Sequence, residues 1–329
     1  MMKVLVVTNT YPTKKWPSMG IFVKEQVESL EKEGIEIDVL FINGWESKLN
    51  YLWGILRLWK CLLTHRYDLV HAHYVFSGII ARCQFLYPVV LTHHGIEVFL
   101  TWQRVPSRLI TYLVDKTIVV SQQQKEKLRY KNMVVIPCGI DFDLFRPMSR
   151  EEVRQELNLP PEKKLVSCVG HYSRPEKRFD IIQAALTLAQ EKDPSIELVL
   201  VRNQTHDIVP LYMNACDVIL LVSDGEGSPM VIKEAMACNL PIVSVPVGDV
   251  PEIIKDTEGC YLCTQDPEDV AVKLLLALSN GKRTEGREKI KHMELSQISR
   301  KIIAQYQEVL HNKKPHIPFW LRKRTNPKV

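Results

Sequence analysis

Short runs of β-branched and other apolar residues alternate with amphipathic stretches along most of the chain. The first apolar run covers residues 3–8, the next apolar positions (Val23, Val27 and Leu30) follow helical spacing, and residues 35–42 are again apolar. This order predicts a strand, a helix and a second strand. Alternation of this kind is typical of a parallel sheet that helices cover on both faces.

The alternation continues in two series that a break separates. We expect further strands of the first series at 68–72, 89–92, 117–120 and 133–137, and in the second series strands at 165–169, 197–201, 217–222 and 241–245 with helices at 180–190 and 229–238. An irregular stretch at 141–147 and a charged helix at 150–157 lie between the two series. We therefore predict an α/β protein of two Rossmann-like domains, at 1–147 and 148–297, that face a central cleft.

Length and composition are those of a folded protein. The chain has 329 residues, and at roughly 150 residues per domain this corresponds to about two domains. It is 46% hydrophobic and 25% charged, which excludes a disordered chain and a small disulfide-stapled module. The longest apolar stretch, at 51–63, is interrupted by Arg57 and Lys60, and the opening apolar run is too short for a signal peptide. We expect no helix that spans a membrane.

The eight cysteines are scattered, mostly through apolar runs. This distribution is typical of buried free thiols in a reducing compartment, so we expect a cytoplasmic location. Cys260 and Cys263 form one CxxC pair, but a zinc site needs further ligands nearby, and a strand position is favoured. We predict no metal site.

The net charge of +5 arises from the carboxyl end. Residues 313–329 contain six Lys or Arg and no acid, around Phe319, Trp320 and Leu321. Aromatic rings and cations together suit an anionic membrane surface, which predicts peripheral membrane attachment. Nucleic acid is a competing partner that we do not favour, and a solvated chain end explains the same composition.

The segment after the third strand of the second series carries the most informative chemistry. Ser228 can cap a helix and Pro229 can occupy its first position. The unpaired N–H groups of Met230 and Val231 would then form an anion site, and Gly227 would let a phosphate approach closely. We expect a diphosphate to bind there.

Two acids belong to the same segment. Glu226 precedes the expected helix and Glu234 lies inside it, and both carboxylates can accept hydrogen bonds from sugar hydroxyls. Together with the preceding strand, the segment resembles the signature of family 4 glycosyltransferases, which have the GT-B fold; from Glu226 it reads EGSPMVIKEAMAC. The resemblance implies that Glu234 holds the nucleotide ribose, that Glu226 contacts the donor sugar at the catalytic centre, and that the amides of 227–231 bind the diphosphate. A solvated helix with two exposed glutamates is the alternative.

A loop at 170–180 also resembles the family, whose corresponding loop clamps the diphosphate with one Arg and one Lys. Cations are needed there because negative charge grows on the diphosphate as the sugar leaves. Lys177 matches the family position. The family usually has Arg directly after the glycine, where this chain has His171, and the resemblance leaves Arg174 as the substitute. For Arg174, a solvent-exposed loop cation is the alternative.

The resemblance extends to the first domain. Residues 88–97 are similar to the family strand that ends in His-Gly near the acceptor cleft, and His94 aligns with that histidine. A histidine there can donate to the donor phosphate or orient the incoming hydroxyl, so His94 and Glu226 are the candidate catalytic residues. His71 and His73 alternate on an expected strand, where core packing or solvent is favoured over a place in the cleft.

Two further positions are compared with the family. Gly20 corresponds to the family's glycine loop, which brings the chain close to the substrate or its phosphate before the next helix; an ordinary turn glycine is the alternative. At the expected crossing between domains, Cys138 replaces a common asparagine, which puts a hinge hydrogen bond at this point in doubt. The nearby Asp141-Phe142-Asp143 reads as a DxD metal motif, but such short matches are frequent by chance.

The resemblance covers about residues 3–310 and is closest to a bacterial subgroup that includes teichuronic-acid biosynthesis glycosyltransferases. It implies an acceptor-binding first domain and a nucleotide-sugar-binding second domain, followed by a helix at 298–312 that crosses back to the first domain. Only nine residues separate Val201 from Leu211, where most family members place a further helix and strand, so we expect a shortened second domain.

The resemblance implies a retaining, metal-independent hexosyltransferase. It would move a sugar from a UDP- or GDP-linked donor, without a further cofactor, to a lipid-linked or polysaccharide acceptor in cell-surface glycan biosynthesis. No GxGxxG follows an expected strand and no GxxxxGK[ST] is present, which disfavours a dehydrogenase and an ATPase. An epimerase or phosphorylase on the same fold, and a non-catalytic membrane-associated scaffold, remain as alternatives.

Overall fold

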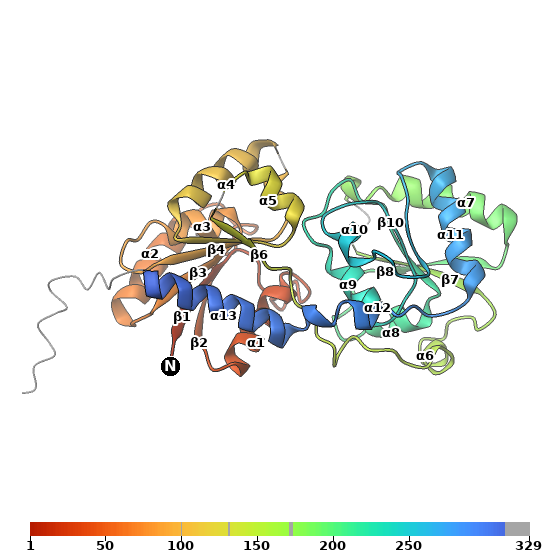
Figure 1. Ribbon diagram of the computed structural model, residues 1–329, viewed down its shortest axis with the longest axis horizontal. Helices are drawn as coiled ribbons and strands as arrows, with labels where there is room; N and C mark the ends of the chain where they lie inside the picture. The colour runs from red at the N-terminus through yellow and green to blue at the C-terminus, as the bar shows by residue number, and fades with distance from the viewer. Residues whose placement is uncertain (100, 131, 171–173, 313–329) are drawn as a thin grey trace, which may run out of the picture.

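The computed structural model describes residues 1–99, 101–130, 132–170 and 174–312. Two parallel β-sheets, each covered by helices, form two lobes that lie side by side (Figure 1). We call the lobe built on the six-stranded sheet the first lobe and the lobe built on the five-stranded sheet the second lobe. This arrangement confirms the predicted α/β class with two Rossmann-like units. The predicted basic tail at 313–329 and His171 lie outside the described residues.

In the first lobe the strands are parallel, in the order β2-β1-β3-β4-β5-β6. Its elements are β1 (Lys3–Thr8), α1 (Ile21–Lys32), β2 (Glu36–Phe41), α2 (Asn50–Thr64), β3 (Leu69–His73), α3 (Val75–Ala81), β4 (Val89–His93), η1 (Ile96–Val98), α4 (Thr101–Leu113), β5 (Lys116–Val119), α5 (Gln122–Leu128) and β6 (Met133–Val135). The central strands are buried along most of their length because helices cover both faces of the sheet.

In the second lobe the strands are again parallel, in the order β11-β10-β9-β7-β8. Its elements are α6 (Arg150–Glu156), β7 (Lys164–Val169), η2 (Pro175–Lys177), α7 (Phe179–Lys192), β8 (Ile196–Val201), α8 (Val209–Ala215), β9 (Val218–Leu221), α9 (Met230–Ala237), β10 (Ile242–Ser244), α10 (Val250–Ile253), β11 (Cys260–Leu262), α11 (Pro267–Asn280), α12 (Gly286–Lys289) and η3 (Lys291–Met293). None of the helices described in either lobe is both long and apolar enough to cross a bilayer.

The chain passes between the lobes twice, and the two passages are bonded to each other. The last helix, α13 (Leu295–Asn312), runs from the second lobe back across the first (Figure 1). It begins at Leu295 rather than at 298, and its buried face, which includes Tyr306, packs with the first-lobe core around Val4. On the other passage, the N–H of Ile140 donates to the carbonyl of Met293 (2.9 Å). The relation between the lobes is therefore fixed by backbone hydrogen bonds as well as by packing.

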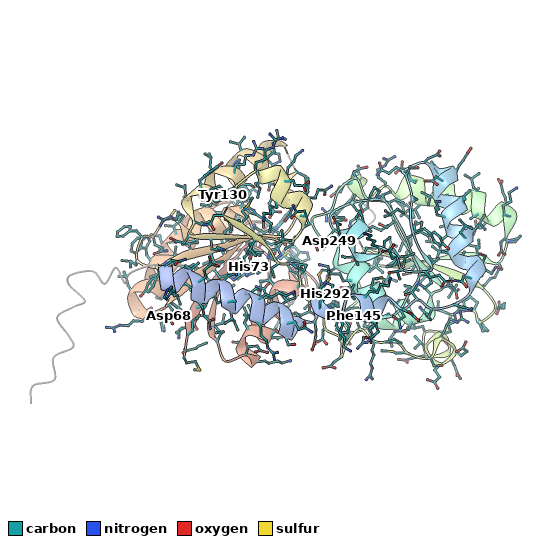
Figure 2. All side chains as sticks on the ribbon, in the orientation of Figure 1. Asp68, His73, Tyr130, Phe145, Asp249 and His292 are labelled. Atoms are coloured by element: carbon teal, nitrogen blue, oxygen red, sulfur yellow. The ribbon has the colours of Figure 1, made fainter. Side chains whose placement is uncertain are left out.

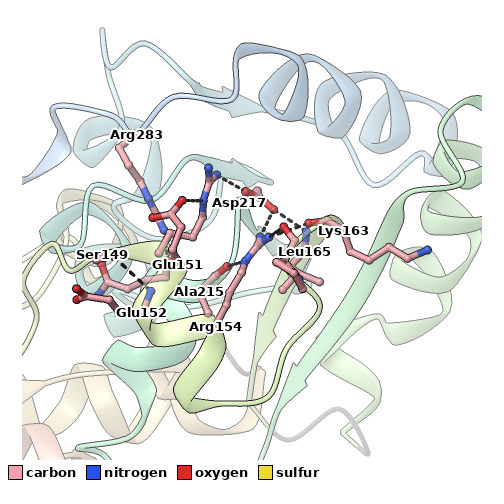
Figure 3. A network of polar contacts seen from close by, with 12 residues as sticks. Ser149, Glu151, Glu152, Arg154, Lys163, Leu165, Ala215, Asp217 and Arg283 are labelled. Carbon is pink, nitrogen blue, oxygen red and sulfur yellow. Dashed lines mark hydrogen bonds and ion pairs between the residues drawn. The ribbon is translucent and has the colours of Figure 1, made fainter.

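A charged network anchors α6 to the amino end of the second sheet (Figure 3). The guanidinium group of Arg154, which is 4% exposed, donates to Asp217 Oδ2 (2.7 Å) and to the carbonyl of Ala215 (2.8 Å). Asp217 also accepts from Arg150 (2.7 Å) and from the N–H of Leu165 (2.7 Å). One carboxylate thus joins α6, β7 and the start of β9, at the end of the sheet away from the carboxyl ends of its strands.

Asp217→Ala should destabilise the protein by about 3–5 kcal/mol, because it leaves the buried Arg154 without its carboxylate partner. Urea unfolding followed by circular dichroism measures this change. The control is Glu28→Ala, which removes the exposed ion pair with Lys24 and should cost only about 0.3–0.5 kcal/mol. Similar losses in the two variants would show that backbone carbonyls alone are sufficient to hold Arg154.

Candidate active site

A cavity of about 360 Å³ lies between the lobes, where the strands of both sheets end. In α/β proteins this edge of the sheet is where ligands bind, because loops and helix amino ends meet there. The lining residues from the first lobe and the crossing segment are Phe22, Tyr74, His94, Gly95, Glu97 and Cys138, and those from the second lobe are Arg174, Glu176, Lys177, Gly225, Glu226, Gly227, Ser228, Pro229 and Met230.

The lobes touch at Gly227. A Cβ atom on this residue would lie 2.4 Å from the carbonyl oxygen of His94 and 2.8 Å from Cα of Gly95. Any side chain here would collide with the backbone of the other lobe. Gly248 supports the contact from behind, since a Cβ atom on it would lie 2.8 Å from the carbonyl oxygen of Gly227. The width of the cavity therefore depends on two glycines.

The helix that follows the predicted diphosphate-binding segment starts one residue later than predicted. α9 begins at Met230, with Pro229 as its N-cap residue and no side-chain cap. The Ser228 hydroxyl donates to Asp249 Oδ2 (2.5 Å) and accepts from Lys233 Nζ (2.5 Å). The predicted cap is wrong, because two charged partners compete with the helix amide for one hydroxyl. The first N–H groups of α9 are thus left without a side-chain cap beside the cavity.

Lys233 is a site residue that the sequence analysis did not single out. Its side chain is fully buried, and its ammonium group donates to Ser228 and to the carbonyl of Cys138 (3.2 Å) and lies 3.4 Å from Asp249. The ammonium group therefore links the crossing segment, α9 and the loop after β10. Figure 2 labels Asp249 in the second lobe and His73 in the first lobe. A lysine within the otherwise apolar run at the start of this helix was the available signal.

Two of the four charged residues predicted to contact the donor form an ion pair with each other. Lys177 Nζ lies 2.6 Å from Glu226 Oε1, and their side chains are 19% and 22% exposed. Arg174 lies at the rim, where it pairs with Glu176 (2.6 Å) and has 57% of its side chain exposed. The N–H of Asp224 donates to the carbonyl of Glu176 (2.9 Å), which ties the two second-lobe loops together. Lys177 is therefore held next to the acid of the motif, and Arg174 stays open to solvent.

His94 reaches the cavity with its ring, but both ring nitrogens contact interior groups. Nε2 lies 2.7 Å from His73 Nδ1, and Nδ1 lies 3.4 Å from Cys138 Sγ. Burial lowers the pKa of His94 well below its usual value and lowers the pKa of His73 to about 3, so both rings are neutral at pH 7. Burial also raises the pKa of Cys138 to about 11, so its thiol is protonated. Both ring nitrogens of His94 thus have a partner, and binding a ligand through a ring nitrogen would require His94 to give up one of them.

Glu234, the predicted ribose residue, is not part of the cavity lining. The residue is 6% exposed. The charged groups that affect its pKa include His206 and Glu25, which form an ion pair across the lobes (2.8 Å). Burial raises the pKa of Glu234 to about 7; His206 opposes this shift and Glu25 adds to it. Burial lowers the pKa of His206, but the hydrogen bond to Glu25 and the nearby carboxylates of Glu25, Glu234 and Asp141 together raise it above its usual value. These groups form an ionisable cluster at the lobe boundary.

Three other sequence candidates also lie outside the lining. Gly20 has φ 68°, and a Cβ atom on it would lie 2.7 Å from the carbonyl of Thr10, so this position requires glycine for its backbone. Phe22, two residues later, does reach the cavity. Val231 is half-buried on α9 and does not line the cavity. His71 is fully buried and bonds to core hydroxyls, as the preference for core packing predicted.

Comparison with known families identifies sequence signals in both lobes. The family described as Glycosyltransferase Family 4 matches residues 5–144, and the family described as Glycosyl transferases group 1 matches residues 199–280. The chain is a glycosyltransferase, and its first lobe matches family 4. The enzyme is similar to the putative teichuronic acid biosynthesis glycosyltransferase TuaC of Bacillus subtilis (23% identity), with 77% of this chain and 83% of TuaC covered. It is also similar to D-inositol 3-phosphate glycosyltransferase of Mycobacterium marinum (25% identity), with 62% and 53% covered.

Solved glycosyltransferase structures share the fold of this enzyme. Sucrose-phosphate synthase from Thermosynechococcus elongatus superposes with a TM-score of 0.80 at 19% identity and covers 95% of this chain and 100% of that one. Anabaena Alr3699/HepE in complex with UDP-glucose superposes with a TM-score of 0.72 at 18% identity and covers 94% and 100%. The GT-B fold expected from the motifs is confirmed.

The structure brings together most, but not all, of the site residues predicted for this glycosyltransferase. Those that share the cavity are His94, Arg174, Lys177, Glu226, Gly227, Ser228 and Met230. Gly20, Val231 and Glu234 lie outside its lining. The roles of all ten residues stay predictions. Lys233, Asp249 and His206 were missed because their contacts join segments that are distant in the sequence. His73 is buried outside the lining, in agreement with the core packing favoured for it, and the sequence did not predict its contact with His94.

Glu234→Gln should gain stability relative to the wild-type enzyme as the pH rises. Glu234 has a folded-state pKa of about 7, above its usual 4.5, so the folded protein keeps a proton that the unfolded chain releases. The stability that the protonated Glu234 carboxyl provides is fully present below pH 4.5 and is lost as the pH rises through 7. This loss is about 3 kcal/mol, and the glutamine side chain of the variant, which does not titrate, does not undergo it. Chemical unfolding of both proteins at mildly acidic and mildly alkaline pH measures this difference. An identical pH dependence of the two proteins would contradict the raised pKa.

Proposed function

We propose that this glycosyltransferase moves a sugar from a nucleotide-diphosphate donor to a lipid-linked or polysaccharide acceptor at the cytoplasmic face of the cell membrane. Transfer would retain the anomeric configuration and use no metal. The observation that supports a nucleotide-diphosphate donor is the Lys177–Glu226 ion pair. It lies beside the uncapped start of α9, in the cavity between the lobes. A cation, bare amides and a carboxylate in one place suit a diphosphate joined to a sugar.

Donor binding would change the partner of Lys177. A diphosphate beside Lys177 and the first amides of α9 would attract the ammonium group more strongly than one carboxylate does, because it carries more negative charge. Glu226 would then be released to accept hydrogen bonds from sugar hydroxyls. As the bond between sugar and diphosphate breaks, Lys177 and the helix amides would stabilise the growing negative charge. Because the chain itself supplies this positive charge, we favour a metal-independent reaction.

Retention is proposed from the family resemblance, and within a retaining reaction the state of the carboxylates in the cavity favours a route without a covalent intermediate. Glu97 accepts a hydrogen bond from the N–H of His94 (3.1 Å), and Glu176 takes part in an ion pair with Arg174 (2.6 Å). Glu226 would be engaged by sugar hydroxyls once the donor is bound. A carboxylate that is already engaged is a weaker nucleophile toward the sugar carbon. We therefore favour attack by the acceptor hydroxyl on the face that the diphosphate leaves, with the hydroxyl proton passing to a diphosphate oxygen.

The choice of substrates rests on similar proteins and on the chain's own charge. HepE of Anabaena has been solved with UDP and with UDP-glucose, which supports a UDP-linked donor, with GDP as the second candidate. Similarity to TuaC supports an acceptor in cell-surface polysaccharide synthesis. The basic tail at 313–329 would add attraction to anionic lipid. We propose no nucleic acid partner and no cofactor besides the donor substrate.

Lys177→Ala should weaken the binding of UDP- or GDP-sugars by about tenfold to a hundredfold, because one charge-assisted hydrogen bond is lost. Glu226→Ala should bind the nucleoside diphosphate at least as tightly as the wild type, since it frees Lys177, but should discriminate less between donor sugars. Isothermal titration calorimetry measures both effects. Lys192→Ala, an exposed position at the end of α7, is the matched control and should bind the donor normally.

Other outcomes of the same titrations would point to the alternative functions. Absence of any nucleotide-sugar binding by the wild-type protein would reject the transferase and favour a non-catalytic scaffold. Donor that is interconverted without an acceptor would indicate an epimerase, and donor consumed only with inorganic phosphate would indicate a phosphorylase. Release of the nucleoside diphosphate that depends on added acceptor is the result expected for transfer.

A further inference from the structure

Exposed hydrophobic side chains are concentrated on one part of the first lobe. Among the described residues, thirteen of the nineteen large exposed hydrophobic side chains lie between Trp45 and Leu113. We define the apolar face as eleven of these, each at least 58% exposed: Leu49, Leu52, Trp53, Leu56, Leu63, Phe85, Trp102, Val105, Leu109, Tyr112 and Leu113. Soluble monomers rarely expose apolar side chains in such a group, so the face indicates an interaction site.

The α2 part of the face is a helical stripe directed away from the core. Leu49, Trp53 and Leu56 recur at helical spacing on the exposed side, whereas Gly54 and Leu58 are buried on the other side. The sequence of α2 fits a helix of the core and a helix of the surface equally well. The structure shows a surface helix, because more than half of the Trp53 and Leu56 side chains is exposed.

α4 repeats this pattern, and aromatic contacts join the two helices. Its exposed positions 102, 105, 109, 112 and 113 also follow helical spacing. The ring of Phe76 on α3 lies 6.0 Å from that of Trp102 on α4 and 5.5 Å from that of Tyr51 on α2, measured between centroids. Trp59 of α2 lies 5.9 Å from Phe85. α3 packs on both α2 and α4, so the two stripes lie on neighbouring parts of the first lobe (Figure 1).

Positive charge accompanies the apolar face. Between Glu46 and Asp115 the chain contains seven Lys or Arg and only two acids, Asp68 and Glu97. Glu97 is 4% exposed and faces the cavity instead of this surface. The seven cations are Lys48, Arg57, Lys60, Arg66, Arg82, Arg104 and Arg108. Cations with long apolar stems beside exposed Trp and Leu are suited to the headgroup region of a bilayer.

The charge distinguishes lipid from a second copy of the chain. A symmetric dimer through α2 and α4 would bring the cations of these helices close to those of the second copy, which opposes association. An anionic bilayer satisfies both features at once, because its headgroups attract the cations and its acyl boundary buries the Trp and Leu side chains.

We propose that the apolar face of α2 and α4 docks on an anionic lipid bilayer and so sets the orientation of the enzyme at the membrane. This inference rests on the proposed function in one respect: it gives a lipid-linked acceptor a route to the cavity. α4 begins at Thr101, two residues after Phe99, and Phe99 lines a second hollow together with Gly225 and Glu226. The docking face therefore starts beside the acid that is predicted to contact the donor sugar.

The test is flotation of the full-length protein with vesicles of phosphatidylcholine alone or of phosphatidylcholine and phosphatidylglycerol in equal parts. The wild type should bind the anionic vesicles, and binding should weaken as salt screens the cations. The double variant Trp53→Glu/Leu109→Glu should bind these vesicles at least about tenfold more weakly, because it removes apolar contacts and adds repulsion. Val272→Glu/Leu276→Glu on α11, also at exposed apolar positions, is the matched control and should bind as the wild type does.

Three further readouts decide between explanations. Binding that survives in Trp53→Glu/Leu109→Glu but is lost when Arg322, Lys323 and Arg324 are changed to Gln would assign docking to the tail and overturn the proposal. A change of oligomeric state in the face variant, with unchanged vesicle binding, would assign the face to a second copy and also overturn it. Calorimetric donor binding should be equal in the wild type and the face variant, so a failure of docking is distinguishable from a failure of the proposed transferase.

Discussion

The close approach of two backbones at Gly227 is the constraint on which the site depends. Because this residue has no side chain, the start of the donor motif lies against the carbonyl of His94 and Cα of Gly95. The carboxyl ends of both sheets therefore meet in one cavity, and groups from the two lobes can act on the same molecule. With a bulkier residue the lobes would separate, and Lys177 and Glu226 would no longer share a cavity with His94.

The buried charged group of Lys233 keeps the two backbones aligned at this contact. Taken alone, a buried ion pair such as Lys233–Asp249 adds little stability compared with apolar residues of the same size, because both groups lose hydration. Removing one partner, however, costs about 3–5 kcal/mol. The Lys233 ammonium group has acceptors on three segments, including Cys138 in the crossing. If the crossing segment shifted relative to α9, the buried ammonium group would lose a hydrogen-bond acceptor. We interpret the lysine as the group that keeps the start of α9 directed at the cavity.

The fold could be predicted further than the site, because the two depend on interactions of different range. β1 occupies the predicted residues 3–8, and α1 contains the predicted apolar positions, since strand and helix patterns arise from near neighbours. The short edge strand β11 has no comparable pattern, and only the strand position favoured for Cys260 and Cys263 pointed to it. The partners of His94 lie 21 and 44 residues away, and Ser228 bonds to Asp249 at a separation of 21 residues. A local motif can identify such residues, but their bonds depend on the folded chain.

The two lobes differ in chemistry in a way that matches two different substrates. A nucleotide-diphosphate sugar is soluble and highly charged, and the groups suited to it, Lys177 and the bare amides of α9, belong to the second lobe. A lipid-linked acceptor is anchored in a bilayer, and the exposed apolar and cationic side chains suited to that environment belong to the first lobe. Each of the two proposed substrates is thus matched by one sheet and its helices. Because both sheets end at the contact made by Gly227, that contact is where the two proposed substrates would meet.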